Sequence, residues 1–152
     1  MAVMGLILSI DEINEHMDQL GLLNPQTKRT LVYGQVMPNA GQLFLFGAYA
    51  QLVKGAYFVM SLEENRIILI PLSKISGKID KKAEPIFIPH EELEGIILKN
   101  GMMMHSATFL GEEQELTLKF AKNGIGMKWH KENLNNTMRE LEKLQKVVGS
   151  GE

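Results

Sequence analysis

The chain has 152 residues, of which 45% are hydrophobic and 22% are charged, with a formal net charge of −2 and an isoelectric point near 6.1. This composition excludes a largely disordered chain, and the length is sufficient for one hydrophobic core. The near-neutral charge provides no global positive field, so we expect no nucleic-acid partner. Cysteine is absent, which excludes disulfides and thiolate chemistry.

The apolar start of the chain, residues 1–10, resembles a secretory signal only in its hydrophobicity. No lysine or arginine precedes it, and the acidic residues Asp11 and Glu12 follow it directly. The other apolar runs are interrupted before they reach the length of about 18 residues that a membrane-spanning helix needs. We therefore expect a cytoplasmic protein.

Two helices are predicted in the first 40 residues. Ser9 and Glu12 have the spacing of a capping box, and apolar residues at steps of three and four extend the first helix over 10–20. Asn24 and Pro25 are typical of a second helix start, which predicts a helix over 25–33, although 30–33 also contains good strand formers. We expect residues 1–40 to form an N-terminal helical appendage to a sheet domain at 41–149.

From residue 42 onward, β-rich segments alternate with turn residues. Strands are predicted at 42–53, 56–62, 66–72, 86–88, 95–99, 103–110 and 115–120. The last of them places Leu116, Leu118 and Phe120 on one side and polar residues on the other, the pattern of a strand with one solvated face. An exposed loop is predicted at 73–84.

A long amphipathic helix is predicted over 130–148. Leu134, Met138 and Leu141 lie on its apolar face, and Trp129 immediately precedes it. A tryptophan at this position is expected to pack into the end of the sheet.

The succession of about seven β segments and one terminal helix, over 42–148, resembles the bacterial branch of the pleckstrin-homology-like (PH-like) superfamily. The resemblance is carried by the hairpin 57–72, the stretch 86–97, the hairpin that ends in Leu116, Leu118 and Phe120, and the helix after Trp129. It implies a mainly-β member of the α+β class, with a strongly bent antiparallel sheet or partly open barrel capped by the helix. It also implies a binding scaffold for phosphoinositides, peptides or proteins, and the bacterial members resemble assembly or interaction modules.

Catalytic and metal-binding patterns are weak in this chain. His16, His90, His105 and His130 are scattered, and no pair has the helical spacing that places two imidazoles on one metal. His90 beside Glu91 and Glu92 is the nearest approach to an acid–base cluster, but adjacent glutamates in a turn are usually only solvated. We therefore predict no catalytic residues, no metal and no cofactor, and an unrecognised enzyme is the least favoured alternative.

Four lysines in the 73–84 loop form the candidate binding site. They are Lys74, Lys78, Lys81 and Lys82. Several ammonium groups on one flexible loop could hold a phosphorylated ligand or an anionic membrane surface. Asp80 and Glu84 offset part of this charge, and the competing interpretation is a solvated loop.

Met102, Met103 and Met104 start a predicted strand and cannot all face inward, because successive strand residues point to opposite faces. Exposed methionines suit an adaptable interface. Our first hypothesis is a non-catalytic interaction module that self-associates through a sheet edge or its N-terminal helices. The second is an anionic-ligand binder that uses the lysine loop.

Overall fold

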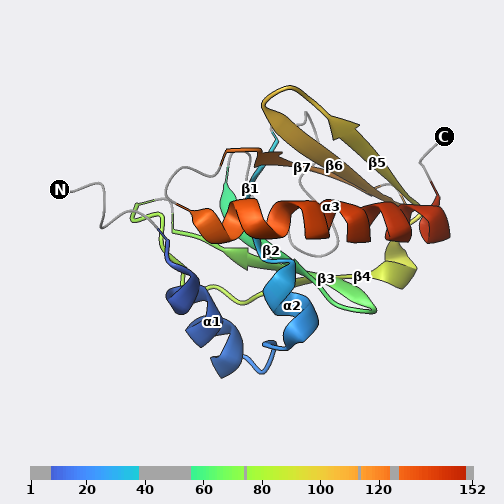
Figure 1. Ribbon diagram of the computed structural model, residues 1–152. Coiled ribbons are helices and arrows are strands. Elements are labelled where there is room, and N and C mark those ends of the chain that lie inside the picture. The colour runs from blue at the N-terminus through green and yellow to red at the C-terminus, as the bar shows by residue number, and fades with distance from the viewer. Residues whose placement is uncertain (1–7, 38–55, 74, 113, 124–126, 150–152) are drawn as a thin grey trace.

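The computed structural model describes residues 8–37, 56–73, 75–112, 114–123 and 127–149 (Figure 1). Its helices and strands, in chain order, are α1 (Ile10–Gln19), α2 (Pro25–Arg29), β1 (Val32–Val36), β2 (Tyr57–Leu62), β3 (Arg66–Pro71), β4 (Ile86–Pro89), the 3₁₀ turn η2 (His90–Glu92), β5 (Gly95–Asn100), β6 (Met104–Gly111), β7 (Gln114–Ala121) and α3 (Lys128–Val148). The strand predicted at 42–53 lies outside the described residues.

The strands form one seven-stranded antiparallel sheet in the order β4-β3-β2-β1-β7-β6-β5. The end strands β4 and β5 do not pair with each other, so the sheet is not closed into a barrel. The predicted fold class, a mainly-β α+β fold with an open antiparallel sheet and a C-terminal helix, is confirmed. The predicted hairpins and the terminal helix are also found within one or two residues of their expected bounds.

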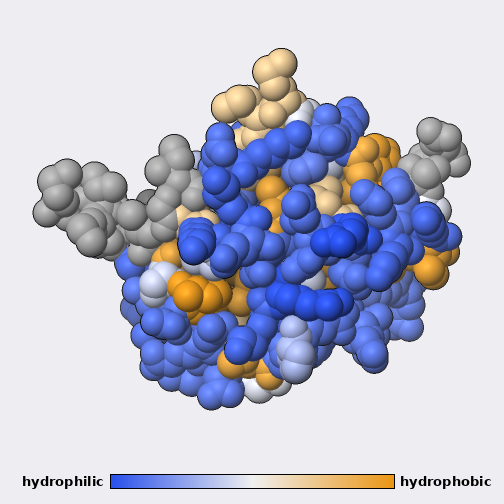
Figure 2. All heavy atoms as spheres, in the orientation of Figure 1, coloured by the Kyte–Doolittle hydropathy of each residue, from blue (hydrophilic) through white to orange (hydrophobic). Residues whose placement is uncertain are grey.

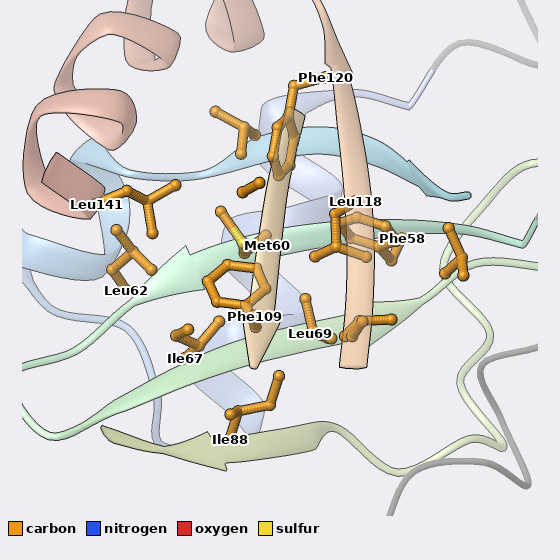
Figure 3. Close-up of a cluster of buried hydrophobic side chains, with 14 of the residues drawn as sticks. Phe58, Met60, Leu62, Ile67, Leu69, Ile88, Phe109, Leu118, Phe120 and Leu141 are labelled. Carbon is orange, nitrogen blue, oxygen red and sulfur yellow. The ribbon is translucent and has the colours of Figure 1, made fainter. Parts of the chain in front are cut away.

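The main hydrophobic core lies between the inner faces of the two halves of the sheet. Figure 3 shows the strand with Leu118 and Phe120 crossing over the strand with Met60, so that their side chains meet. The core residues shown there are fully or almost fully buried: Phe58, Met60, Leu62, Ile67, Leu69, Ile88, Phe109, Leu118, Phe120 and Leu141. Helix α3 covers the open side of this core with its apolar face, as its sequence pattern predicts.

Strand β1 joins the two halves of the sheet, because it pairs with β2 on one side and with β7 on the other. The prediction of a helix over 25–33 is wrong beyond Arg29, where α2 ends, and the alternative of a strand starting near residue 30 is closer. Buried and half-buried residues alternate along β1, which places Val32 and Val36 in the core. The sheet therefore begins before residue 41, and the segment 1–40 is not purely helical.

A second core lies on the other face of β2 and β3, under α1. Ile13 and Met17 of α1 are fully buried there against Val59, Ile68 and other apolar residues of the sheet. Because β2 and β3 are buried on both faces, α1 forms a packed layer on the sheet. At the start of α1 the Ser9 hydroxyl accepts a hydrogen bond from the Glu12 amide at 3.2 Å, which is one half of the predicted capping box, while the Glu12 carboxylate pairs with Lys78.

Polar contacts fix α3 to the connection between α2 and β1. The Thr137 hydroxyl donates to the Thr30 carbonyl at 2.9 Å, and the Asn133 side-chain amide donates to the Leu31 carbonyl at 3.1 Å. Trp129 lies in the first turn of α3, because the helix starts at Lys128, two residues earlier than predicted, and its indole N–H donates to the Leu8 carbonyl at 3.1 Å. None of the helices in the described ranges is long and apolar enough to cross a bilayer.

Candidate functional site

The loop between β3 and β4 carries the predicted lysine site. Lys74 lies outside the described residues, and Lys81 and Lys82 are exposed. The Lys78 ammonium lies 3.0 Å from a carboxylate oxygen of Glu12 on α1. This ion pair ties the loop to α1 and neutralises one of the four predicted cations.

A cavity of about 290 Å³ separates this loop from α1. Its lining residues are Glu12, Glu15, His16, Gln19, Lys78, Ile79 and Lys81. Burial, with a smaller contribution from the Lys81 charge, lowers the pKa of His16, so its imidazole is neutral at neutral pH. The charged groups that line the cavity are the carboxylates of Glu12 and Glu15 and the ammonium groups of Lys78 and Lys81, so its formal charges balance. Lys82 does not line the cavity, and the described lysines therefore do not form one cationic site.

His130 is buried and holds three elements together. Its Nδ1 accepts a hydrogen bond from the Tyr33 backbone N–H of β1 at 3.0 Å, so its Nε2 carries the proton and donates to the Ala121 carbonyl at 2.6 Å. Burial lowers the pKa of His130, and the hydrogen bond to Ala121 offsets this only in part. The neutral ring is thus a structural link between α3, β1 and the end of β7.

We expect His130→Ala to lower the free energy of unfolding by about 2–4 kcal/mol at about pH 7, because a cavity forms and the Tyr33 and Ala121 groups lose their partner. The lowered pKa means that the unfolded chain binds the proton first as the pH falls. This histidine's contribution to stability is therefore complete above about pH 6.5 and decreases as the pH falls from there toward the lower folded pKa.

Urea denaturation at about pH 7 and about pH 5, followed by circular dichroism, measures both effects. The variant should lose less stability on acidification than the wild-type chain does. His105→Ala is the control for the hydrogen bonds: burial also lowers the pKa of His105, but its ring is only half-buried and has no hydrogen-bond partner among the described residues, so the loss of stability at about pH 7 should be smaller. Equal pH dependence in the wild type and His130→Ala would show that this imidazole does not govern acid sensitivity.

Two concave surface features lie beside the C-terminal half of α3. One open cleft of about 590 Å³ is bordered by α2 and the β2–β3 turn, and its lining is Pro25, Gln26, Arg29, Leu62, Glu63, Glu64, His90, Glu140, Lys143, Leu144 and Val147. A second, of about 690 Å³, extends toward β4 and η2, and its lining is Glu64, Asn65, Arg66, Pro89, His90, Glu91, Leu144, Val147 and Val148. Because the two share Glu64, His90, Leu144 and Val147, we describe them as one groove, the α3 cleft.

The α3 cleft has an apolar floor. Val147 is 82% exposed, Leu144 is half-buried, and Leu62 beneath them is almost fully buried. Figure 2 shows hydrophobic atoms at the surface near the C-terminal end of α3, at the right of the view. Binding of a partner that covers this valine and the apolar groups beside it would remove apolar surface from water, which lowers the free energy of the complex.

The rim of the cleft is charged, and most of its cations are already paired. The Glu140 carboxylate lies 3.1 Å from the Lys143 ammonium and 4.0 Å from the Arg29 guanidinium, and Arg66 pairs with Glu63. Glu64 and Glu91 are exposed, and neither forms an ion pair with any residue that the structure describes. The uncompensated charge of the rim is therefore negative.

His90 lies where the two parts of the α3 cleft meet. Burial lowers its pKa, and a hydrogen bond to the backbone of Glu64 offsets this only in part, so the ring is neutral at neutral pH. Its Nε2 atom is buried and has no hydrogen-bond partner within the described part of the chain. Its sequence neighbours Glu91 and Glu92 are exposed on η2, and the described residues contain no cluster that could hold a metal ion.

Sequence reasoning did not find the α3 cleft, because its lining comes from positions between 25 and 148 that share no local motif. One signal was available. Val147 lies outside the apolar face that Leu134, Met138, Leu141 and Val148 form, because it stands about 100° around the helix from Val148, on the side away from Leu134. That spacing indicates an exposed apolar residue at the end of α3.

The sheet order and the terminal helix define the class of the protein, which is an α+β domain with an open antiparallel sheet. Its order of elements, strands followed by one C-terminal helix, is the order that the PH-like resemblance implies. No protein-family model matches the chain, and no curated protein matches it. Among solved structures, it is similar to the hSac2 domain from the human phosphoinositide phosphatase Sac2, with 11% identity, a TM-score of 0.42, and coverage of 92% of this chain and 82% of that chain. A TM-score this low supports no functional conclusion.

Proposed function

We propose that this protein is a non-catalytic, PH-like interaction module whose α3 cleft binds an apolar and basic segment of a protein partner. The exposed Val147 beside Leu144, in a groove with an acidic rim, carries this proposal. The cytoplasmic location and the bacterial branch of the superfamily, both expected from the sequence, are parts of the same proposal.

The charge of the rim supports a basic partner. Arg29 and Lys143 share the single carboxylate of Glu140, and Arg66 pairs with Glu63. These pairs leave one positive charge on the rim, and the two unpaired carboxylates of Glu64 and Glu91 outweigh it. A lysine or arginine in the partner would complement these two carboxylates and would speed association. The apolar floor would supply most of the affinity, because full burial of one exposed valine stabilises a complex by about 1.5–3 kcal/mol.

A different protein partner is favoured over self-association. The apolar face of α1 is buried, so Ile13 and Met17 are not available to a second copy. Edge strand β4 ends at Pro89, which has no N–H to offer. On edge strand β5, the Ile96 N–H donates to the Gly149 carbonyl at 2.9 Å, and the Ile96 carbonyl accepts from the Gln145 side chain at 2.7 Å. Both edges are thus partly blocked.

The anionic-ligand alternative at the lysine loop has less support. Lys78 already pairs with Glu12, and the adjacent cavity contains Glu15 as well. A phosphate placed there would meet two carboxylates.

Selection from a random-peptide phage library tests the proposal. We expect the selected peptides to combine large apolar residues with lysine or arginine, and Val147→Ser to weaken their binding about tenfold through lost apolar burial. Ile75→Ser is the matched control, because Ile75 is 96% exposed on the distant β3–β4 loop. Both substitutions are at the surface and should leave the melting temperature almost unchanged. Absence of enriched peptides, or equal losses in the two variants, would refute the proposal.

The double substitution Glu64→Gln with Glu91→Gln separates the contribution of the rim's charge to peptide binding from that of the apolar floor. We expect the selected peptides to bind about threefold more weakly at low salt, with a smaller decrease in affinity as salt is added. Glu132→Gln is the control, since Glu132 is exposed near the opposite end of α3. An unchanged salt dependence would show that these two carboxylates do not contact the peptide.

A further inference from the structure

The tip of the β5–β6 hairpin displays methionines to solvent. Met102 is 92% exposed and Met103 is 67% exposed, and Met104 at the start of β6 is also exposed. We call these three residues the methionine tip. In Figure 1 the hairpin extends away from α2 and the β2–β3 turn, and Figure 2 shows hydrophobic atoms protruding at the same place, at the top of the view. The tip is convex, so no part of the described chain covers it.

The methionine tip is held in place by backbone contacts. The Gly101 N–H donates to the Met104 carbonyl at 2.9 Å, and the Lys122 N–H after β7 donates to the Met103 carbonyl at 3.0 Å. The pairing of β5, β6 and β7 continues to the base of the tip, at Asn100 with His105 and at Met104 with Ala121. The exposed side chains are therefore presented on an ordered backbone, which reduces the entropy lost on binding.

Cations flank the tip, and acidic residues are absent from the hairpin between Gly95 and Gly111. Lys99 and Lys119 both lie opposite Ser106, on one face of the sheet, and Lys122 directly follows β7. None of these three lysines forms an ion pair with a described residue. His105 lies on the inner face at this end, and burial together with the Lys122 charge lowers its pKa, so the lysines supply the charge at neutral pH.

We propose that the methionine tip and its three lysines form a contact with the surface of an anionic lipid bilayer. A convex apolar tip can enter the region below the lipid headgroups, and ammonium groups around its base then lie at the level of the phosphates. The charge is complementary to anionic lipid. This contact lies apart from the lysine loop and from the α3 cleft, so both the cleft and the membrane are accessible at once.

Cosedimentation with vesicles tests this contact. The probes are vesicles of phosphatidylcholine alone and vesicles in which about a third of the lipid is phosphatidylserine. We expect the wild-type chain to sediment with the second kind only. Replacing both Met102 and Met103 by serine should reduce the bound fraction about tenfold or more, and Lys99→Gln and Lys122→Gln should each reduce it about fivefold.

The controls use matched side chains elsewhere on the surface. Ile75→Ser removes an equally exposed apolar group, and Lys82→Gln removes an exposed lysine of the loop between β3 and β4. Both should bind vesicles as the wild type does. No sedimentation of the wild type, or equal losses in the controls, would overturn the proposal. So would a dimer, measured by light scattering without lipid, that dissociates when Met102 and Met103 are replaced, because the tip would then contact a second copy.

Discussion

Deletion of residues 1–40 is expected to abolish cooperative folding of the remaining chain. The deletion removes β1, which pairs with β2 through Val32–Met60 and the residues that follow, and with β7 through Gln35–Lys119. Without β1, the three-stranded units β2–β3–β4 and β5–β6–β7 share no ladder. The deletion also uncovers the outer face of β2 and β3, because it removes α1.

The magnitude of this effect follows from the core residues that are lost. Ile13, Met17, Leu31, Val32 and Val36 are all buried. Each contributes roughly 1.5–3 kcal/mol by burial, and their sum is comparable to the whole stability of a typical domain.

Circular dichroism during heating measures this prediction directly. The full chain should show one cooperative transition, and the truncated chain should show none. Adding a synthetic peptide of residues 1–40 is the positive control, because the missing strand and helices can then pack from a separate chain. A cooperative transition in the truncated chain alone would contradict this expectation and would mean that residues 41–149 fold independently as a sheet domain.

Substitution of Gly34 is expected to destabilise the fold through overpacking. A Cβ atom at Gly34 would lie 2.7 Å from Cζ of Phe58 and 2.9 Å from Cδ1 of Phe120. Both rings are fully buried and pack edge to face, with centroids 6.2 Å apart, so neither can move into solvent. β1 therefore needs a glycine where the two halves of the sheet meet.

We expect Gly34→Ala to lower the free energy of unfolding by about 2–3 kcal/mol and Gly34→Val to lower it further, because the larger side chain displaces both rings. Urea denaturation measures the change. Gly34→Ala combined with Phe58→Leu should be less destabilising than the sum of the single substitutions, since the smaller side chain makes room for the methyl group. Strict additivity, or wild-type stability of Gly34→Ala, would show that the contact is not tight.

The parts of the fold that could be predicted from sequence are those with strong local periodicity. The strands 57–62 and 66–71 are joined by a short polar turn, and α3 has a regular apolar face. β1 was missed because its five residues follow a helix start at Asn24 and Pro25. Its identity as a strand depends on pairing with β2 and β7, which are distant in sequence.

The binding surfaces were less predictable for a related reason. The pairing of Lys78 with Glu12 joins positions 66 residues apart, and no local pattern shows that this lysine is neutralised. The α3 cleft likewise depends on how α2, the β2–β3 turn and α3 meet. For Met102 to Met104, strand alternation predicted partial exposure. The exposure is greater than expected because β6 starts at Met104 and leaves Met102 and Met103 in the turn.

Amide chemical-shift mapping tests the central claim, that the α3 cleft is the protein-binding site. The ¹⁵N-labelled chain would be titrated with a peptide selected from the phage library. We expect the largest shift changes at Glu64, His90, Leu144 and Val147, which line both parts of the cleft. Shift changes confined to the lysine loop or to the methionine tip would contradict the claim and would assign peptide binding to that surface.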